Sequence, residues 1–386
     1  MEEVFYMLAN LSAIFNEILA VIMSMLLSFG SLFGTMAPPT TETPDIYYDD
    51  NIKNVIFLIG DGMGYNHWEK TKQERGIELA VETMEYCGSS MTRSLSAEVT
   101  DSAAGGTALS TGVRTYNGGI GVYFDDPFDT VSHPMNITEL CMERGMMTGV
   151  VTTDETTGAT PSAFSAHSSD RGNHEEMTND QFTSGIDLIW GTNNGYATKR
   201  AANENGYTYI TTYDEMMALE EGSRSYAQFT NNLWTLEQSD ENTPNLEQMT
   251  EKAIDLLDDT DEGFFLMVEG AHIDKHSHSN DDEAMTEAME EFDRTIALCL
   301  EYAKADGETL VIVTADHETG AITLNADGTY SFTSGSHSAA DVPIRVYGTD
   351  KIVKDNETIN NYEIPMRIAY VLGYDDTAFP REVMVA

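Results

Sequence analysis

The chain has 386 residues, 41% of them hydrophobic, which is enough apolar material for one large α/β domain or two ordinary domains. Its 65 acidic residues outnumber its 20 lysines and arginines, so the formal net charge is −45. This charge excludes a nucleic-acid-binding module, because nucleic acid would repel it, and it favours cations as ligands. A solvated surface suited to salty or extracellular surroundings explains the bulk of the charge equally well.

The first 45 residues differ in composition from residues 46–386, which we expect to form the main globular domain. The stretch "ILAVIMSMLLSFGSLF" from Ile18 is apolar enough for an export signal or a membrane anchor. No lysine or arginine precedes it, and its apolar residues recur at helical spacing, so a helix docked on the domain is the alternative. The sequence thus predicts a secreted or cell-envelope protein, with possible membrane association through residues 5–33.

After the linker "APPTTETPD", apolar strand patterns alternate with helical patterns. Strands are predicted at residues 54–61, 147–154, 264–270, 310–318 and 341–348, and a long helix at residues 281–307. This alternation predicts a three-layer α/β/α sandwich around a mostly parallel sheet. Residues of about 172–250 are polar and weakly periodic, and we expect them to form an insert or cap with short helices.

The three cysteines, Cys87, Cys141 and Cys299, lie far apart in the sequence and form no CxxC pair. This spacing implies neither a disulfide framework nor a zinc knuckle. Buried free thiols are therefore expected.

Acidic and histidine side chains occur where the predicted strands end. Asp61, Glu269 and the pair Asp316–His317 follow or close three strands, and ligands of open α/β sheets bind at such carboxyl ends. Asp274 and His278 are four residues apart, and His337 precedes the last predicted strand. Taken alone, the Asp316–His317 pair and the Asp274–His278 spacing are more often structural, and Asp101 in "TDSAAGGTA" is as readily a helix cap as a site residue. Together these signals favour a divalent-metal site. A dinucleotide site is excluded, because Tyr65 stands where GxGxxG needs glycine.

Six motifs in order resemble the alkaline phosphatases. They are "IGDGMG", "TDSAAGGTALSTGVRTYNG", "GATPSAFSAHSSDR", "VEGAHIDKHSH", "TADHETG" and "SGSH", and they span about residues 50–372. The resemblance implies hydrolysis of small phosphate monoesters, with inorganic phosphate as an inhibitory product, at a site of two zinc ions and one magnesium ion. By matched motif the implied ligands are Asp274, His278 and His337 for one zinc, Asp61, Asp316 and His317 for the other, and Asp61, Glu269 and Thr160 for magnesium.

The same resemblance implies roles for three further side chains. Ser102 matches the nucleophile, Arg171 the group that binds the substrate phosphate, and Asp101 the residue that orients Arg171. The small residues after Ser102 would let a helix approach the metal site closely. A sulfatase is disfavoured because its Cys-x-Pro-x-Arg signature is missing. A phosphodiesterase of the same superfamily and a non-catalytic acidic metal-binding surface protein stay open as alternatives.

Two departures from the family pattern carry predictions. Gly158 stands where relatives commonly have an acidic residue or histidine near the magnesium, so we expect weak magnesium binding that Gly158→Asp would strengthen. The segment between His317 and His337 is short, so the crown that covers the site in many relatives must be reduced. A homodimer, which the crown usually supports, remains possible but is in doubt.

Overall fold

The computed structural model describes residues 48–124, 131–230 and 242–374, which belong to one compact unit, Pro44–Ala386. The apolar stretch at residues 5–33 lies outside these ranges, so the choice between export, anchoring and docking stays a prediction. In the part of the chain that is described, no helix is both long and apolar enough to cross a membrane.

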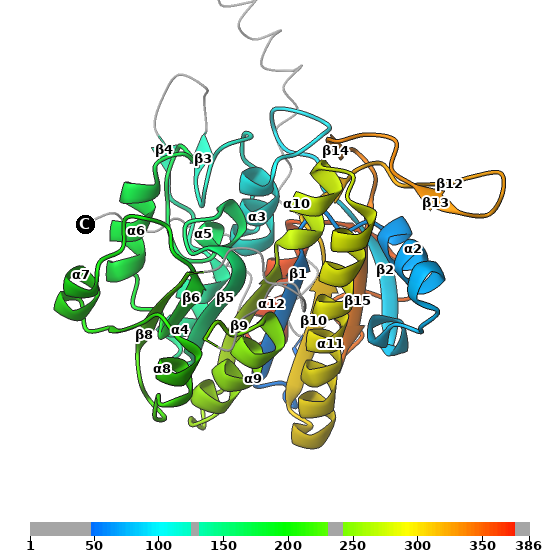
Figure 1. The fold of residues 1–386 in the computed structure, drawn as a ribbon. Coiled ribbons are helices and arrows are strands. Elements are labelled where there is room, and N and C mark those ends of the chain that lie inside the picture. The colour runs from blue at the N-terminus through cyan, green and yellow to red at the C-terminus, as the bar shows by residue number, and fades with distance from the viewer. Residues whose placement is uncertain (1–47, 125–130, 231–241, 375–386) are drawn as a thin grey trace, which may run out of the picture. The chain divides into compact units, whose positions relative to one another are not determined.

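A ten-stranded sheet forms the centre of the described unit (Figure 1). Only β15 runs antiparallel to its neighbours; the other pairings are parallel, so the predicted mostly parallel sheet is confirmed. In spatial order the strands are β16 (Thr358–Asn360), β2 (Tyr86–Met91), β15 (Val342–Tyr347), β10 (Thr309–Thr314), β1 (Asn54–Gly60), β9 (Phe264–Gly270), β5 (Met147–Glu155), β6 (Leu188–Thr192), β8 (Ser225–Phe229) and β7 (Thr208–Ile210).

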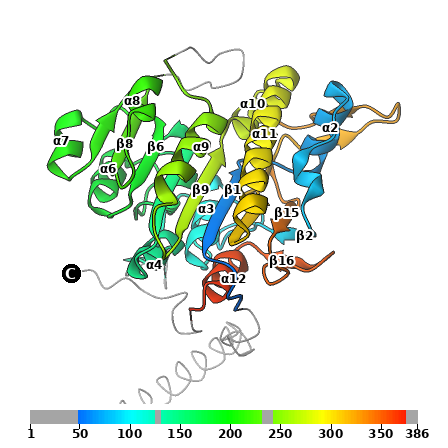
Figure 2. The same ribbon diagram turned by 90° about the horizontal axis from the view of Figure 1, so that it is seen from below.

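Helices cover both faces of this sheet, which confirms the three-layer sandwich (Figures 1 and 2). Strand β1 shows why, because Ile56 and Leu58 join one buried cluster while Val55, Phe57 and Ile59 join the other. The first cluster includes residues of α2 (Tyr65–Arg75), α8 (Tyr213–Met217), α9 (Leu246–Leu257), α10 (His272–His278) and α11 (Asp282–Asp306). The second includes residues of α3 (Ser102–Thr111), α4 (Ile137–Glu143), α5 (Ala159–Ala163), α6 (His174–Thr183), α7 (Lys199–Glu204) and α12 (Glu363–Val371).

The long helix predicted at residues 281–307 is present as α11. Its cap Asp281 accepts a hydrogen bond from the backbone N–H of Ala284, 3.2 Å away. The helix ends at Gly307, whose φ of +81° is a left-handed conformation that favours glycine. Local sequence therefore sets both ends of this helix.

The structure differs from expectation at residues 172–250. Strands β6, β7 and β8 of this segment pair with one another and with β5, so they extend the central sheet instead of forming a separate cap. Their side chains are largely buried, and burial on a sheet outweighs the polar local sequence. Cys141 and Cys299 are buried free thiols as predicted, whereas Cys87 is half-buried.

Short elements occupy the region around the edge where the predicted site lies. The link between His317 and His337 consists of β11 (Glu318–Thr319), the hairpin of β12 (Thr323–Leu324) and β13 (Tyr330–Ser331), and β14 (His337–Ser338). This hairpin extends away from the sheet in Figure 1. It belongs to the segment in which a reduced crown was expected. Elsewhere in the described residues, the remaining short elements are the 3-10 helix Ala80–Thr83 and the strand pair of β3 (Tyr123–Phe124) and β4 (Val131–Ser132).

Candidate active site

Three adjacent parallel strands bring the predicted carboxylates to one edge of the sheet. Strand β1 lies between β9 and β10, with Ile59 in register with both Glu269 and Thr314. Asp61 and Asp316 therefore leave the sheet side by side at its carboxyl edge, next to Glu269.

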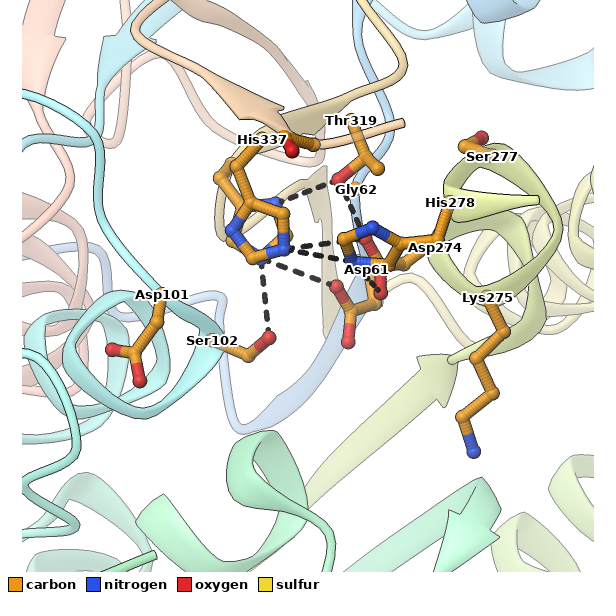
Figure 3. Close-up of polar contacts among 12 residues, drawn as sticks. Asp61, Gly62, Asp101, Ser102, Asp274, Lys275, Ser277, His278, Thr319 and His337 are labelled. Carbon is orange, nitrogen blue, oxygen red and sulfur yellow. Dashed lines mark hydrogen bonds and ion pairs between the residues drawn. The ribbon is translucent and has the colours of Figure 1, made fainter. Parts of the chain in front are cut away.

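Ser102 is the first residue of α3 and points toward this edge (Figure 3). Its Oγ atom lies 3.1 Å from Nε2 of His317, and the serine is buried. Asp101 caps the helix by accepting a hydrogen bond from the N–H of Ala104 at 3.0 Å. The free N–H groups of a helix N-terminus favour negative charge, so this position suits a group that becomes anionic.

Glycines allow α3 to approach the site closely. A Cβ atom on Gly105 would lie only 2.9 Å from the backbone oxygen of Asp316, and one on Gly106 would lie 3.2 Å from Cα of Thr160. The small residues that follow Ser102 thus fit the close packing expected from the sequence.

The group Asp274, His278 and His337 converges on one point (Figure 3). The Nε2 atoms of the two histidines lie 3.1 Å apart, and the Asp274 oxygens lie 3.3 Å from Nε2 of His278 and 3.6 Å from Nε2 of His337. Each Nδ1 faces a backbone carbonyl instead, that of Gly335 for His278 and that of Thr100 for His337. These carbonyls hold the proton on Nδ1 and leave the Nε2 lone pairs directed at the same space.

Asp61, Asp316 and His317 form a second, deeper group. Nε2 of His317 lies 3.2 Å from Oδ2 of Asp316 and 3.5 Å from Oδ1 of Asp61, and all three residues are buried. Oδ1 of Asp316 accepts backbone hydrogen bonds from Gly62 and His317, whereas Oδ2 of Asp316 and Oδ1 of Asp61 have no hydrogen-bond partner among the described residues. Buried carboxylate oxygens without partners are costly unless a cation neutralises them.

The pKa values of these carboxyl groups reflect the crowding. Burial, together with the charges of Asp316 and Asp274, raises the pKa of Asp61 well above its ordinary value. Burial and the charge of Asp274 raise the pKa of Asp316 to about 6, and burial and the charge of Asp154 raise that of Glu269 to about 8. Such carboxylates repel one another when all are ionised, which is the electrostatic condition of a site that holds divalent cations.

Thr160 and Glu269 lie on elements that pack against each other beside Asp61. Helix α5 contacts β9 and α3, and Oγ1 of Thr160 is buried and has no hydrogen-bond partner within the part of the chain that the structure describes. Glu269 is buried, accepts a hydrogen bond from the hydroxyl of Thr152, and its charge raises the pKa of Asp61. Both side chains therefore have oxygen lone pairs that are available to a cation beside Asp61.

Arg171 forms an ion pair with Asp101, the residue that the family resemblance implied would orient it. Its guanidinium donates to Oδ2 of Asp101 at 2.9 Å, and the same oxygen accepts from the N–H of Gly118 at 3.0 Å. The Arg171 side chain is 43% exposed, so its remaining N–H groups are accessible to a ligand.

Two side chains of the site escaped the sequence reasoning. Thr319 donates a hydrogen bond to Asp274 at 2.5 Å and lies 3.2 Å from Nδ1 of His317, so it connects the two candidate metal-ligand groups. Lys275 forms an ion pair with Asp154. Lys275 stands inside the motif "HIDKHSH", and its position beside Asp274 was the available signal.

The donor geometry fits divalent metal ions. In the described residues, ligand atoms of Asp61, Asp316 and His317 lie within 4.8 Å of one another, as do those of Asp274, His317 and His337. His317 belongs to both groups, and His278 completes the second through its contacts with Asp274 and His337. Carboxylate oxygens with imidazole nitrogens are the donor set that zinc accepts. The individual ligand assignments remain predictions.

Comparison with known proteins identifies the family. A family model described as alkaline phosphatase matches residues 52–190 and 191–351. The chain belongs to the alkaline phosphatase family. The matched residues contain every member of the candidate site from Asp61 to His337.

Relatives of this alkaline phosphatase family chain cover most of its length. Alkaline phosphatase 3 of Bacillus subtilis is 32% identical over 84% of this chain and 74% of its own length. Alkaline phosphatase 4 of the same organism is 36% identical over 72% of this chain, which spans 64% of that relative. The solved alkaline phosphatase of the Antarctic bacterium TAB5 has 31% sequence identity and a TM-score of 0.72, covering 84% of this chain and 99% of that one. A variant of the TAB5 enzyme has been solved with magnesium bound in its M3 site.

Proposed function

We propose that this alkaline phosphatase family enzyme hydrolyses phosphate monoesters through a phosphoserine intermediate on Ser102. Membership of the family makes the chain a phosphomonoesterase, and its relatives are named alkaline phosphatases. The observation that carries the intermediate is the position of Ser102, buried at a helix N-terminus with Oγ 3.1 Å from His317. Capping of α3 does not explain this position, because Asp101 and not Ser102 caps the helix.

The residues around Ser102 fit two zinc ions and one magnesium ion. Bound there, such ions would neutralise phosphoryl oxygens, lower the pKa of hydroxyl groups and stabilise a departing alkoxide. We assign the zinc ligands to two residue groups, Asp274, His278 and His337, and Asp61, Asp316 and His317. Asp61, Glu269 and Thr160 would hold magnesium. The partnerless oxygens of Asp61, Asp316 and Thr160 support this assignment.

The chain's own residues then account for the two chemical steps. Ser102 loses its hydroxyl proton, and Oγ forms a bond to phosphorus while the bond from phosphorus to the alcohol oxygen breaks. That alcohol oxygen takes up a proton and leaves. Water then attacks the phosphoserine, so that the P–Oγ bond breaks, Ser102 regains its proton and inorganic phosphate is released. The N-terminus of α3 favours the anion at Oγ in both steps.

Arg171 is suited to hold the phosphoryl group in both steps. Its ion pair with Asp101 fixes the guanidinium, while its remaining N–H groups can bind two non-bridging oxygens as a fork. A monoester presents those oxygens as a dianion, whereas a diester presents a single charge and needs space for a second arm. We therefore propose monoesters as the substrate class and inorganic phosphate as an inhibitory product.

A comparison of ester classes tests the proposed function. The purified chain is assayed with a chromogenic phosphate monoester and the matching diester, before and after chelation, and again after zinc and magnesium are restored. We expect fast monoester hydrolysis, little diester hydrolysis, loss with chelator and recovery with metal. Preferred diester hydrolysis would favour the phosphodiesterase alternative, and bound metal without turnover would favour a metal-binding surface protein.

We also propose a secreted or cell-envelope location, supported by the apolar stretch from Ile18 to Phe33. Cell fractionation with an antibody to the catalytic domain tests it. Membrane association through residues 5–33 and homodimer formation stay predictions, which flotation and light scattering would check.

A further inference from the structure

Asp154 occupies the space that a side chain at position 158 would need. Gly158 has φ −54°, a conformation open to every residue, so its backbone does not require glycine. A Cβ atom at this position would instead lie 2.6 Å from Oδ2 of Asp154 and 3.0 Å from the backbone oxygen of Glu155. The missing side chain at 158 thus makes room for the carboxylate of Asp154.

Asp154 is tied to the metal-ligand residues from two directions. Its backbone N–H donates to Oγ1 of Thr152 at 2.8 Å, and the Thr152 hydroxyl donates to Glu269. Its carboxylate accepts a hydrogen bond from Nζ of Lys275, which lies on α10 between Asp274 and His278. Asp154 is therefore linked to both Glu269 and the helix that carries two candidate zinc ligands.

The charges around Asp154 form one cluster. Asp154 contributes to the raised pKa of both Asp61 and Glu269, although burial is the larger cause in each case. Burial lowers the pKa of Lys275, but the charges of Asp154, Glu269 and Asp61 raise it overall. Lys275 is thus an ammonium ion beside three carboxylates. If all are ionised, the set has the excess negative charge that one divalent cation neutralises.

We propose that Asp154 supplies, directly or through water, the acidic group of the magnesium site that position 158 lacks, and that Lys275 competes with the ion for it. Magnesium takes oxygen ligands in octahedral geometry and keeps several waters, so a carboxylate arriving from residue 154 serves as well as one from 158. The inference rests on the proposed function in that it assumes a magnesium site beside Asp61, Glu269 and Thr160.

Binding of Mn²⁺, measured by electron paramagnetic resonance on zinc-loaded protein, tests this role without any turnover. Asp154→Asn should weaken binding of the manganese probe by about tenfold or more, which is the usual effect of removing a ligand or its partner. Glu155→Gln is the matched control, because it removes a half-buried carboxylate from the adjacent position at the end of β5. Equal affinities in wild type and Asp154→Asn, or equal weakening in both variants, would overturn the assignment.

Two further variants distinguish the loss of the carboxylate from poor folding of the variant. The double variant Asp154→Gly with Gly158→Asp moves the carboxylate within one site and should bind Mn²⁺ within about threefold of wild type. Gly158→Asp alone, which the sequence predicted to strengthen binding, should not do so, because its side chain meets Asp154. A double variant no better than Asp154→Asn would contradict the proposal even if the latter folds poorly.

Lys275→Met removes the competing ammonium and should tighten Mn²⁺ binding severalfold, whereas unchanged or weaker binding would refute the competition. Thermal melts of each zinc-loaded variant establish that the affinities compare folded proteins. Hydrolysis of the monoester by wild type is measured separately. Inactive wild type with the expected Mn²⁺ affinities would reject the proposed function alone, and active wild type with unchanged affinities would reject only the role of Asp154.

Discussion

The reactivity that we propose for Ser102 rests on the surroundings of a single oxygen atom, its Oγ. An ordinary serine hydroxyl is a weak nucleophile at neutral pH. Here Oγ lies at the positive end of α3 and 3.1 Å from His317, within a set of groups suited to hold cations. The helix N-terminus favours the ionised over the neutral hydroxyl, and cations held by these groups would add to this effect. This charge environment distinguishes Ser102 from Ser110 of the same helix.

Ser102→Ala should reduce monoester turnover by roughly three orders of magnitude or more, because no other group can form the P–O bond in its place. Phosphate binding should remain, since Arg171 and the metal ligands are unchanged. Turnover is measured by the chromogenic assay and phosphate affinity by calorimetry. Ser110→Ala, a buried serine of the same helix, is the control and should keep most activity. Wild-type rates in Ser102→Ala would contradict the nucleophile assignment.

At the scale of elements, the packing of α3 decides where Ser102 lies. Gly105 faces the backbone oxygen of Asp316, which cannot move without shifting the loop that carries His317. Gly106 faces the backbone of Thr160 and Cβ of Ala163 at 3.2 Å, a tight but less severe approach. A larger side chain at either position must push the helix away from the site.

Gly105→Ala should therefore lower both the free energy of unfolding, by about 1–3 kcal/mol, and the turnover. Gly106→Ala should have a smaller effect on both, because its new Cβ meets its neighbours at longer distances. Urea denaturation and the chromogenic assay on zinc-loaded proteins give the two readouts. The reverse ranking, or full activity in Gly105→Ala, would show that this close approach does not position Ser102.

A second element-scale feature is the carboxyl group of Glu291, which joins α11 to α9. Oε1 of Glu291 accepts a hydrogen bond from the first N–H of α9, that of Leu246, at 3.0 Å. Burial raises the pKa of Glu291 to about 7, although this hydrogen bond opposes the shift. Because the folded pKa exceeds its unfolded value of 4.5, ionisation destabilises the fold. The contribution of Glu291 to stability is thus lost as the pH rises from about 4.5 to 7 and stays lost above it.

Glu291→Gln keeps the acceptor for Leu246 but cannot ionise. We expect this variant to match wild type in unfolding free energy near pH 4.5 and to exceed it by up to about 3 kcal/mol at pH 9. Urea denaturation at several pH values measures the difference, and Glu290→Gln serves as a comparison from the adjacent position. A difference that is the same at both pH values would contradict the raised pKa.

At the scale of the whole molecule, charge is the dominant feature. With 65 acidic and 20 basic residues, most carboxylates have no cationic partner, and mutual repulsion opposes the compact state. Surface ion pairs such as Lys53–Glu308 offset little of it, because both partners are half-exposed. Dissolved cations are therefore the main source of compensation.

Added NaCl should raise the melting temperature of the protein. At about 0.1 M ionic strength the screening length is roughly 10 Å, which is short enough to weaken repulsion between separate surface carboxylates. Scanning calorimetry between low and high salt measures the trend, with metal content held constant. A melting temperature that decreases steadily with NaCl would mean that local ion pairs outweigh the general repulsion.

Sequence reasoning was most successful where the chemistry is carried by short motifs. The family resemblance implied that Asp101, next to Ser102 in the sequence, orients Arg171, and in the structure Arg171 donates a hydrogen bond to Asp101. The strands of residues 188–229 were missed, because their polar local sequence is overridden by burial in the sheet. Burial of this kind depends on distant segments.

The contact between Asp154 and Lys275 could not be predicted from the sequence. Lys275 follows Asp274 in the sequence, and Asp154 is the last residue of a predicted strand, but nothing in either segment indicates that they meet. Their contact depends on how β5 and β9 are paired and on the space above Gly158. Pairings between separate segments are absent from local patterns.

The backbone carbonyls that bind Nδ1 of His278 and His337 also bear on what happens when the protein loses its metal ions. Because Gly335 and Thr100 orient the two rings, the rings need no ion to keep their direction. We therefore expect both rings to keep their direction when metal is removed from the proposed site. A protein stripped of metal ions would then rebind them without refolding, and its activity would recover with the supply of metal and would not need new protein synthesis.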